Sequence, residues 1–211
     1  MNSNISIHII TILALTLTGC AVQKVDLSES NLEVINRKII TTDNTANTIV
    51  MNAQKSDGLA ILSGTDFASG TIELELKGEN TPGKSFVGLA FNIQNDSTYE
   101  AIYFRPFNFQ SPKAIRRQHS IQYIYHPKNN WRYLRTNYEG QYEAEYVRQP
   151  APEDWFATKI VITADNVTVY DRQTGTELLS VKRIAKQTSN RIALWAGYNS
   201  KGEYRNLIIR K

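Results

Sequence analysis

Short segments in which apolar and polar residues alternate, each ended by a turn signal, most limit the folds open to this chain. In residues 71–76, for example, Ile or Leu alternates with Thr or Glu, as expected of a strand that buries one face. The predicted strands are residues 32–40, 49–53, 59–62, 71–76, 86–93, 99–104, 120–125, 131–136, 155–162, 167–170, 191–195 and 204–209. Asp165-Asn166 predicts a hairpin turn between residues 155–162 and 167–170, and residues 173–175 predict a second hairpin turn. No segment sustains the 3.6-residue period of a long helix, so the sequence predicts an all-β fold, an antiparallel β-sandwich or barrel.

An apolar run at residues 5–17 comes before the strands. It is shorter than the ~20 apolar residues that span a bilayer, and it has the length of the apolar region of a secretory signal peptide. It ends in Leu17-Thr18-Gly19-Cys20, which resembles the bacterial lipobox. The resemblance implies a lipid anchor at Cys20, which divides the chain into a signal peptide (1–19), a lipidated tether (20–30) and one sandwich domain (31–211).

The same resemblance implies a location in the bacterial cell envelope. Ala21 follows the cysteine instead of the aspartate that retains some lipoproteins at the inner membrane. We therefore expect the outer membrane, on its periplasmic or surface face.

Cysteine content and net charge limit the metal sites, disulfides and partners that this chain can have. Cys20 is the only cysteine, so the chain can form neither an internal disulfide nor a cysteine metal site. His119 and His126 lack a standard metal-ligand spacing, and we predict no metal and no cofactor. The formal net charge of +4 is a mild basic bias that suits acidic glycans or lipid headgroups. Nucleic acid is not expected as a partner of a secreted lipoprotein.

The C-terminal third carries motifs of a known fold. Trp155 opens a strand, Val167-Thr168-Val169-Tyr170 forms half of a hairpin, and residues 191–195 and 202–209 form a closing strand pair. These motifs resemble the end of a concanavalin A-like (LamG-like) jelly roll. More narrowly, they are similar to the domain family named for 3-keto-disaccharide hydrolase, although its W-x-x-x-D-G-K opening is absent. The resemblance implies a jelly-roll sandwich and cleavage of glycosidic bonds in (3-keto) saccharides.

Residues 99–131 concentrate aromatic and basic side chains in one stretch. In its first strand Tyr99, Tyr103 and Arg105 share one face, and Glu100 shares the other with Ile102 and Phe104. The Ile102 side is the natural core, so we expect the Tyr/Arg face to line an open groove. Tyr99 and Tyr103 would stack on sugar rings, and Arg105 would anchor a carboxylate, a sulfate or paired hydroxyls.

The next strand adds candidates for catalysis. His119 and Tyr123 alternate with Gln122 and could serve as an acid/base pair, because imidazole titrates near neutrality. The competing interpretation is structural, as for most histidines in strands. Gln122 and Trp131 complete the expected groove, and Glu100 would supply a carboxylate if the strand register were reversed. Trp155 and Trp195 lie in apolar runs and are expected in the core.

Two enzyme templates fit poorly. Residues 73–78 come nearest to the E-x-D-x-x-E motif of family 16 glycoside hydrolases, but Gly78 stands where the acid is needed. Glu73 and Glu75 are better explained as a solvated strand face. Gln118-His119 and residues 196–199 are faintly similar to motifs of family 7 polysaccharide lyases, with the wrong spacing.

Three functions stay open from the sequence. The first is an envelope lipoprotein that acts on or binds a poly- or oligosaccharide, including acidic ones, and that contacts the membrane through Cys20. The second is a non-catalytic glycan-binding module, and the third is an adhesion or scaffold protein. The sequence leaves open whether the chain is an enzyme.

Overall fold

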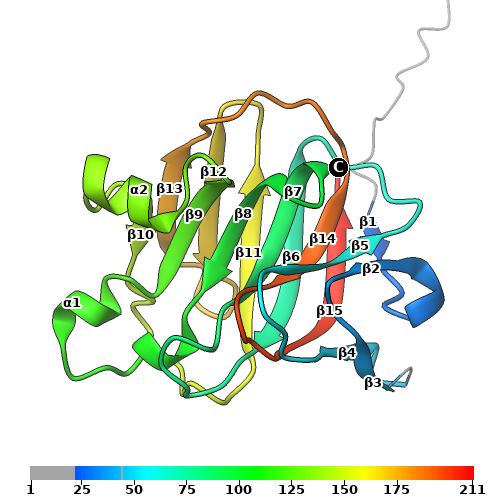
Figure 1. Ribbon diagram of the computed structural model, residues 1–211, viewed down its shortest axis with the longest axis horizontal. Helices are drawn as coiled ribbons and strands as arrows, with labels where there is room; N and C mark the ends of the chain where they lie inside the picture. The colour runs from blue at the N-terminus through cyan, green and yellow to red at the C-terminus, as the bar shows by residue number, and fades with distance from the viewer. Residues whose placement is uncertain (1–21, 44) are drawn as a thin grey trace, which may run out of the picture.

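Two antiparallel β-sheets pack face to face in this protein (Figure 1). The structure is a computed structural model that describes residues 22–43 and 45–211. The predicted signal peptide and lipidation site at Cys20 lie outside the described residues. In the described part of the chain, no helix is long and apolar enough to cross a membrane.

The rear sheet in Figure 1 has eight strands. In spatial order they are β13 (Glu177–Lys182), β12 (Asn166–Asp171), β11 (Phe156–Ile162), β6 (Gly70–Lys77), β15 (Gly202–Arg210), β4 (Thr48–Met51) and β3 (Ile39–Asp43), with β1 (Val22–Lys24) also paired to β15. The hairpins predicted from β11 through β13 are confirmed by antiparallel pairing.

The front sheet has seven strands. In order they are β10 (Glu143–Ala144), β9 (Ile121–His126), β8 (Thr98–Phe104), β7 (Val87–Asn95), β14 (Ile192–Ala196), β5 (Gly58–Leu62) and β2 (Leu32–Ile35). The helical segments of the described chain are short: η1 (Glu29–Asn31), η2 (Pro106–Asn108), α1 (Ala114–Arg117) and α2 (Trp131–Asn137). The all-β antiparallel sandwich predicted from the sequence is confirmed.

The core fills the space between the sheets. Burial alternates residue by residue along β11, with Phe156, Ile160 and Ile162 inward and Lys159 outward. Full burial of such a side chain stabilises the fold by about 1.5–3 kcal/mol. In the front sheet, β14 is buried throughout and β7 along most of its length. Aromatic side chains on the outer face of this sheet line the candidate site.

Two strand predictions are wrong. Residues 131–136 lie in helix α2. The Asn130 side chain caps this helix, because its Oδ1 atom accepts hydrogen bonds from the backbone N–H groups of Arg132 and Tyr133, each at 3.1 Å. Residues 32–40 are two strands in different sheets.

The expected tether at residues 20–30 also differs from the structure. From Val22 onward it packs onto the sandwich: β1 pairs with β15, and Leu27 is buried in the core.

Candidate functional site

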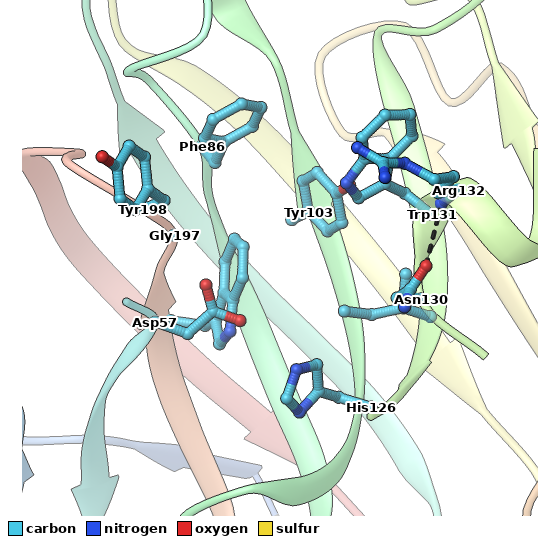
Figure 2. Close-up of a pocket in the computed structure, with 11 residues that line it drawn as sticks. Asp57, Phe86, Tyr103, His126, Asn130, Trp131, Arg132, Gly197 and Tyr198 are labelled. Carbon is cyan, nitrogen blue, oxygen red and sulfur yellow. Dashed lines mark hydrogen bonds between the residues drawn. The ribbon is translucent and has the colours of Figure 1, made fainter. Parts of the chain in front are cut away.

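The outer face of the front sheet holds a groove of about 360 Å³. The residues that line it come from β8, β9 and β14, the segments before β5 and β7, the start of α2 and the loop after β14 (Figure 2). The lining residues are Asp57, Phe86, Tyr103, Ile124, His126, Asn130, Trp131, Arg132, Trp195, Gly197 and Tyr198.

Two aromatic side chains form the floor of the groove, on either side of a glycine. Gly88 on β7 pairs with Tyr103 on one side and with Trp195 on the other. A Cβ at position 88 would lie 2.7 Å from the Tyr103 Cα atom, so only glycine fits without displacing the strand. The rings of Tyr103 and Trp195 thereby approach to 4.9 Å between centroids. Both side chains are almost fully buried and form a fixed surface.

Two exposed aromatic rings stand at the sides of this floor. Trp131 is 41% exposed and Tyr198 is 50% exposed. Trp131 is the first residue of α2, whose Asn130 cap fixes the direction of the helix. The guanidinium carbons of Arg132 and Arg135 lie 5.4 and 5.1 Å from the centre of the Trp131 ring, within the range of cation–π attraction. These contacts hold an exposed indole beside the groove.

Polar groups lie at one end of the groove. Asp57 accepts a hydrogen bond from the Tyr99 hydroxyl through Oδ2 at 2.8 Å. His126 stacks on Tyr99 with 5.2 Å between ring centroids. His126 Nδ1 lies 2.7 Å from the Ser97 carbonyl oxygen. A carbonyl can only accept, so Nδ1 carries the proton and Nε2 is an acceptor when the ring is neutral. A carboxylate and an imidazole at one end can exchange hydrogen bonds with ligand hydroxyls.

A second pocket of about 240 Å³ adjoins the groove and shares Phe86 and Trp131 with it. Arg105, His119 and Arg135 line it as well. Arg105 is 6% exposed, and burial lowers the pKa of its guanidinium, partly opposed by Tyr103.

The hydrogen bonds of Arg105 all go to neutral acceptors. Nη1 donates to the His119 carbonyl at 2.7 Å. Nη2 donates to the Tyr103 hydroxyl at 2.7 Å and to Gln122 Oε1 at 3.3 Å. Burial raises the pKa of Tyr103 to about 12, so this phenol accepts from Arg105 and keeps its own proton for another acceptor.

His119 lies between Arg105 and a buried carboxylate. Its Nδ1 atom is 2.9 Å from Glu143 Oε2, a contact that lacks the geometry of a hydrogen bond. Glu143 also accepts from Arg135 Nε at 3.0 Å and from Nη2 at 2.6 Å. Burial lowers the pKa of His119; Glu143 opposes this shift, whereas Arg135 and Arg105 reinforce it. The imidazole is therefore neutral at pH 7, because its ordinary pKa of about 6.5 is already below that value.

Several residues proposed from the sequence gather on this face. Tyr103, Arg105, His119 and Trp131 line the groove or the second pocket, and Gln122 bonds Arg105 beneath them. Tyr99 supports Asp57 from below.

Glu100 and Tyr123 do not reach the groove. They lie between the sheets with no solvent exposure, and the Tyr123 hydroxyl donates to Glu100 Oε1 at 2.5 Å. Arg183 Nη2 donates to Glu100 Oε2 at 2.5 Å. The expected position of Tyr123 beside His119 in a groove is wrong, because Tyr123 pairs with Ile102 on the interior face. Glu100 would have faced outward only with a reversed register, and the register is not reversed.

Sequence reasoning missed part of the site. Asp57 lies in a loop that shows only a turn signal in the sequence, Tyr198 lies in the faint lyase-like motif of residues 196–199, and His126 is considered above only as a metal ligand. Trp195 is buried, as predicted, but its ring forms groove floor as well as packing. No group of three His, Cys, Asp or Glu in the described ranges is placed to hold a metal ion.

No protein-family model and no curated protein sequence matches the chain. Solved structures do match. The carbohydrate-binding module CBM66 from Bacillus subtilis has a TM-score of 0.52 at 12% identity, over 84% of this chain and 93% of that one. The Bacillus licheniformis β-glucanase has a TM-score of 0.55 at 7% identity, over 93% and 99%.

A third similar structure is the exoplasmic/lumenal domain of VIP36 in its Ca²⁺/Man3GlcNAc-bound form. It has a TM-score of 0.59 at 9% identity, over 90% of this chain and 87% of that domain. A similar Bacillus subtilis protein is described as galectin-like in fold, with a TM-score of 0.58 at 12% identity, over 90% of this chain and 95% of that one. At these identities the likeness concerns the fold alone. This chain has the concanavalin A-like jelly-roll fold that its C-terminal motifs resemble.

Proposed function

We propose that the chain binds a poly- or oligosaccharide in the groove on the front sheet. The observation that carries this proposal is the pair of exposed rings, Trp131 and Tyr198, beside a buried aromatic floor. Pyranose rings present flat apolar faces that pack on aromatic side chains, and their hydroxyls need the acceptors and donors that Asp57 and His126 supply. Pockets of this kind, mainly apolar with a few converging polar groups, are typical of small-ligand sites. The sugar-binding structures of the same fold support the proposal.

The number of carboxylates that line the groove fits binding better than catalysis. Most glycoside hydrolases place two carboxyl groups across the scissile bond, and the groove is lined by a single carboxylate, Asp57. Glu143 lies outside the groove and is held by Arg135 and His119. A non-catalytic glycan-binding module is therefore the function that the geometry supports best.

A hydrolase of the 3-keto-disaccharide type is the second candidate. It is favoured by one observation, the position of the His119 imidazole in a pocket that adjoins the groove, where burial lowers its pKa. An imidazole held neutral near pH 7 can accept a proton from a hydroxyl or from water. In this alternative His119 is the acid/base and Arg105 holds the substrate.

The deciding experiment measures affinity and product release together. The full chain in detergent is tested against neutral, uronate-containing, sulfated and 3-keto glycans, with His119→Ala in parallel. We expect retention of at least one glycan with no product. Release of sugar that disappears in His119→Ala would establish the hydrolase instead. Absence of both binding and turnover across the panel would refute the carbohydrate proposal and favour a scaffold or adhesion role.

The lipid anchor at Cys20 and the outer-membrane location are part of the same proposal. Because β1 begins at Val22, an acyl group on Cys20 would hold the sandwich close to the membrane surface. Labelling with an alkyne fatty acid in a bacterial host tests this, with Cys20→Ser as the control. Label that persists in Cys20→Ser, or that never enters the wild type, would contradict the anchor.

A further inference from the structure

Arg105 is one of two buried arginines in the described chain that form no ion pair with a carboxylate. Arg183 forms an ion pair with Glu100. Arg37 donates to four backbone carbonyl oxygens, those of Asn36, Ser56, Ala196 and Gly197. Arg105 likewise donates only to neutral acceptors, but to three instead of four, and no carboxylate of the described residues forms an ion pair with it. Burying a charge without a counter-charge is costly, so the position of this guanidinium calls for an explanation.

The pocket beside Arg105 is electrically unbalanced. Two guanidinium groups, those of Arg105 and Arg135, and the imidazole of His119 line it. The nearest carboxylate, Glu143, does not line this pocket and is engaged by Arg135 and His119. One carboxylate therefore faces two permanent cations, and the unmatched charge is on Arg105.

Arg105 also keeps donors in reserve. A guanidinium has five N–H donors, and the three hydrogen bonds described above leave the Nε donor and one Nη1 donor without a partner among the described residues. An acidic oxygen in the pocket would meet both a charge and hydrogen-bond donors. Arginine favours carboxylate and sulfate-like groups for this reason.

We propose that the pocket lined by Arg105, His119 and Arg135 is a subsite for the anionic group of a glycan, a uronate carboxylate or a sulfate ester. The inference rests on the proposed function, because the glycan itself is held in the adjoining groove. Phe86 and Trp131 belong to both cavities, so one sugar can pack on Trp131 while its acidic substituent, or that of the next residue, reaches Arg105. The preferred ligand is an acidic polysaccharide.

The test compares matched pairs of glycans on the full chain in detergent. One pair is a uronate-containing oligosaccharide and its carboxyl-reduced form; the other is a sulfated oligosaccharide and its desulfated form. We expect the acidic member of at least one pair to bind about ten-fold more tightly or better, as for a hydrogen bond between charged groups. The pair that shows the preference identifies the anion.

Variants locate the preference. Arg105→Lys keeps the charge and removes the planar set of donors, and Arg135→Gln leaves Glu143 to repel an anion. Each should reduce the ratio of acidic to neutral affinity. Arg116→Gln is the matched control, because it removes one positive charge from an exposed residue of α1 outside the pocket. If Arg105→Lys does not fold, Arg135→Gln and the salt dependence of wild-type binding still test the subsite, since added salt should weaken the acidic member more.

The outcomes separate the two proposals. Neutral glycans that bind as tightly as their acidic partners would overturn the anionic subsite and leave the groove intact. An acidic preference unchanged in both pocket variants would also overturn it, because residues outside this pocket would then bind the acidic group. Failure of every glycan to bind would refute the proposed function itself.

Discussion

The indole N–H of Trp195 donates a hydrogen bond to the Tyr99 hydroxyl at 3.1 Å, and that hydroxyl donates to Asp57 Oδ2 at 2.8 Å. This chain of contacts links β14, β8 and the turn before β5. Burial, reinforced by the negative charge of Asp57, raises the pKa of the Tyr99 phenol far above its ordinary value. Tyr99 is therefore a neutral donor that fixes the groove carboxylate against the groove floor.

Tyr99→Phe should loosen that carboxylate and destabilise the fold. The Trp195 indole N–H would lose its acceptor in a buried place, which costs about 1–3 kcal/mol, and Asp57 would lose its fixed rotamer. Urea denaturation measures the first effect and glycan affinity the second. Tyr138→Phe is the matched control, because Tyr138 is exposed and its hydroxyl forms no hydrogen bond within the described residues. Equal stability of the two variants would show that Tyr99 does not act through its hydroxyl.

Trp131→Ala should weaken glycan binding with little change in stability. Its ring is exposed and stacks on arginines at the groove edge. Loss of an aromatic anchor typically costs at least about 1.4 kcal/mol, or ten-fold in affinity. Trp155→Ala makes the same chemical change at a tryptophan that packs on Arg205 of β15, in the other sheet, at 4.2 Å. Isothermal titration should separate them; similar affinities for both variants would exclude Trp131 from the site.

The sequence predicted the partition of β8 between groove and core because Ile102 and Phe104 are strongly apolar and Arg105 is not. It failed on β9, where Gln122 and Tyr123 lie on opposite faces and each face carries one isoleucine and two polar-tipped side chains. Alternation says which residues share a face, not which face is buried. Cross-strand pairing of Tyr123 with Ile102 decides it.

Loop residues of the site could not be predicted for another reason. Asp57 and Tyr198 are far apart in sequence and line the same groove because β5 and β14 pair side by side, with Leu59 opposite Trp195. A turn signal shows that a loop exists and carries no information about what it will face. The helix at Trp131 could have been predicted, since Asn130 is a favourable N-cap, whereas the sequence pattern predicts a strand over residues 131–136.

Glu100→Gln should destabilise the sandwich without reducing glycan affinity in the folded fraction. Glu100 is buried and receives hydrogen bonds from Arg183, Asn92 and Tyr123. Removing one partner of a buried pair leaves an uncompensated charge, here on Arg183, and costs about 3–5 kcal/mol.

Glu33→Gln provides the comparison for Glu100→Gln. It breaks an ion pair with Arg191 in which the glutamate is 59% exposed, and exposed pairs contribute about 0–1 kcal/mol. Thermal unfolding should rank the two variants clearly. A Glu100→Gln protein that is fully folded yet has lost turnover or binding would restore Glu100 to the functional residues.

His119 should titrate below the ordinary histidine range, and its titration should make the fold less stable in acid. Burial favours the neutral imidazole more than Glu143 favours the charged one. The unfolded chain, with a histidine pKa of about 6.5, then binds a proton at a pH where the folded chain does not. Stability rises with pH wherever the unfolded state holds more protons. The neutral side chain therefore stabilises fully above about pH 6.5, and this contribution falls as the pH drops towards the folded pKa.

NMR of the imidazole gives the folded pKa directly, and denaturation of wild type and His119→Gln between about pH 7.5 and 5.5 gives its effect on stability. We expect a midpoint below 6.5 and a difference between the two proteins that shifts in favour of the variant as the pH falls. A midpoint above that value would mean that the 2.9 Å contact with Glu143 outweighs burial. The imidazole would then carry a positive charge near neutrality, strengthening the anionic subsite and removing the neutral base on which the hydrolase alternative depends.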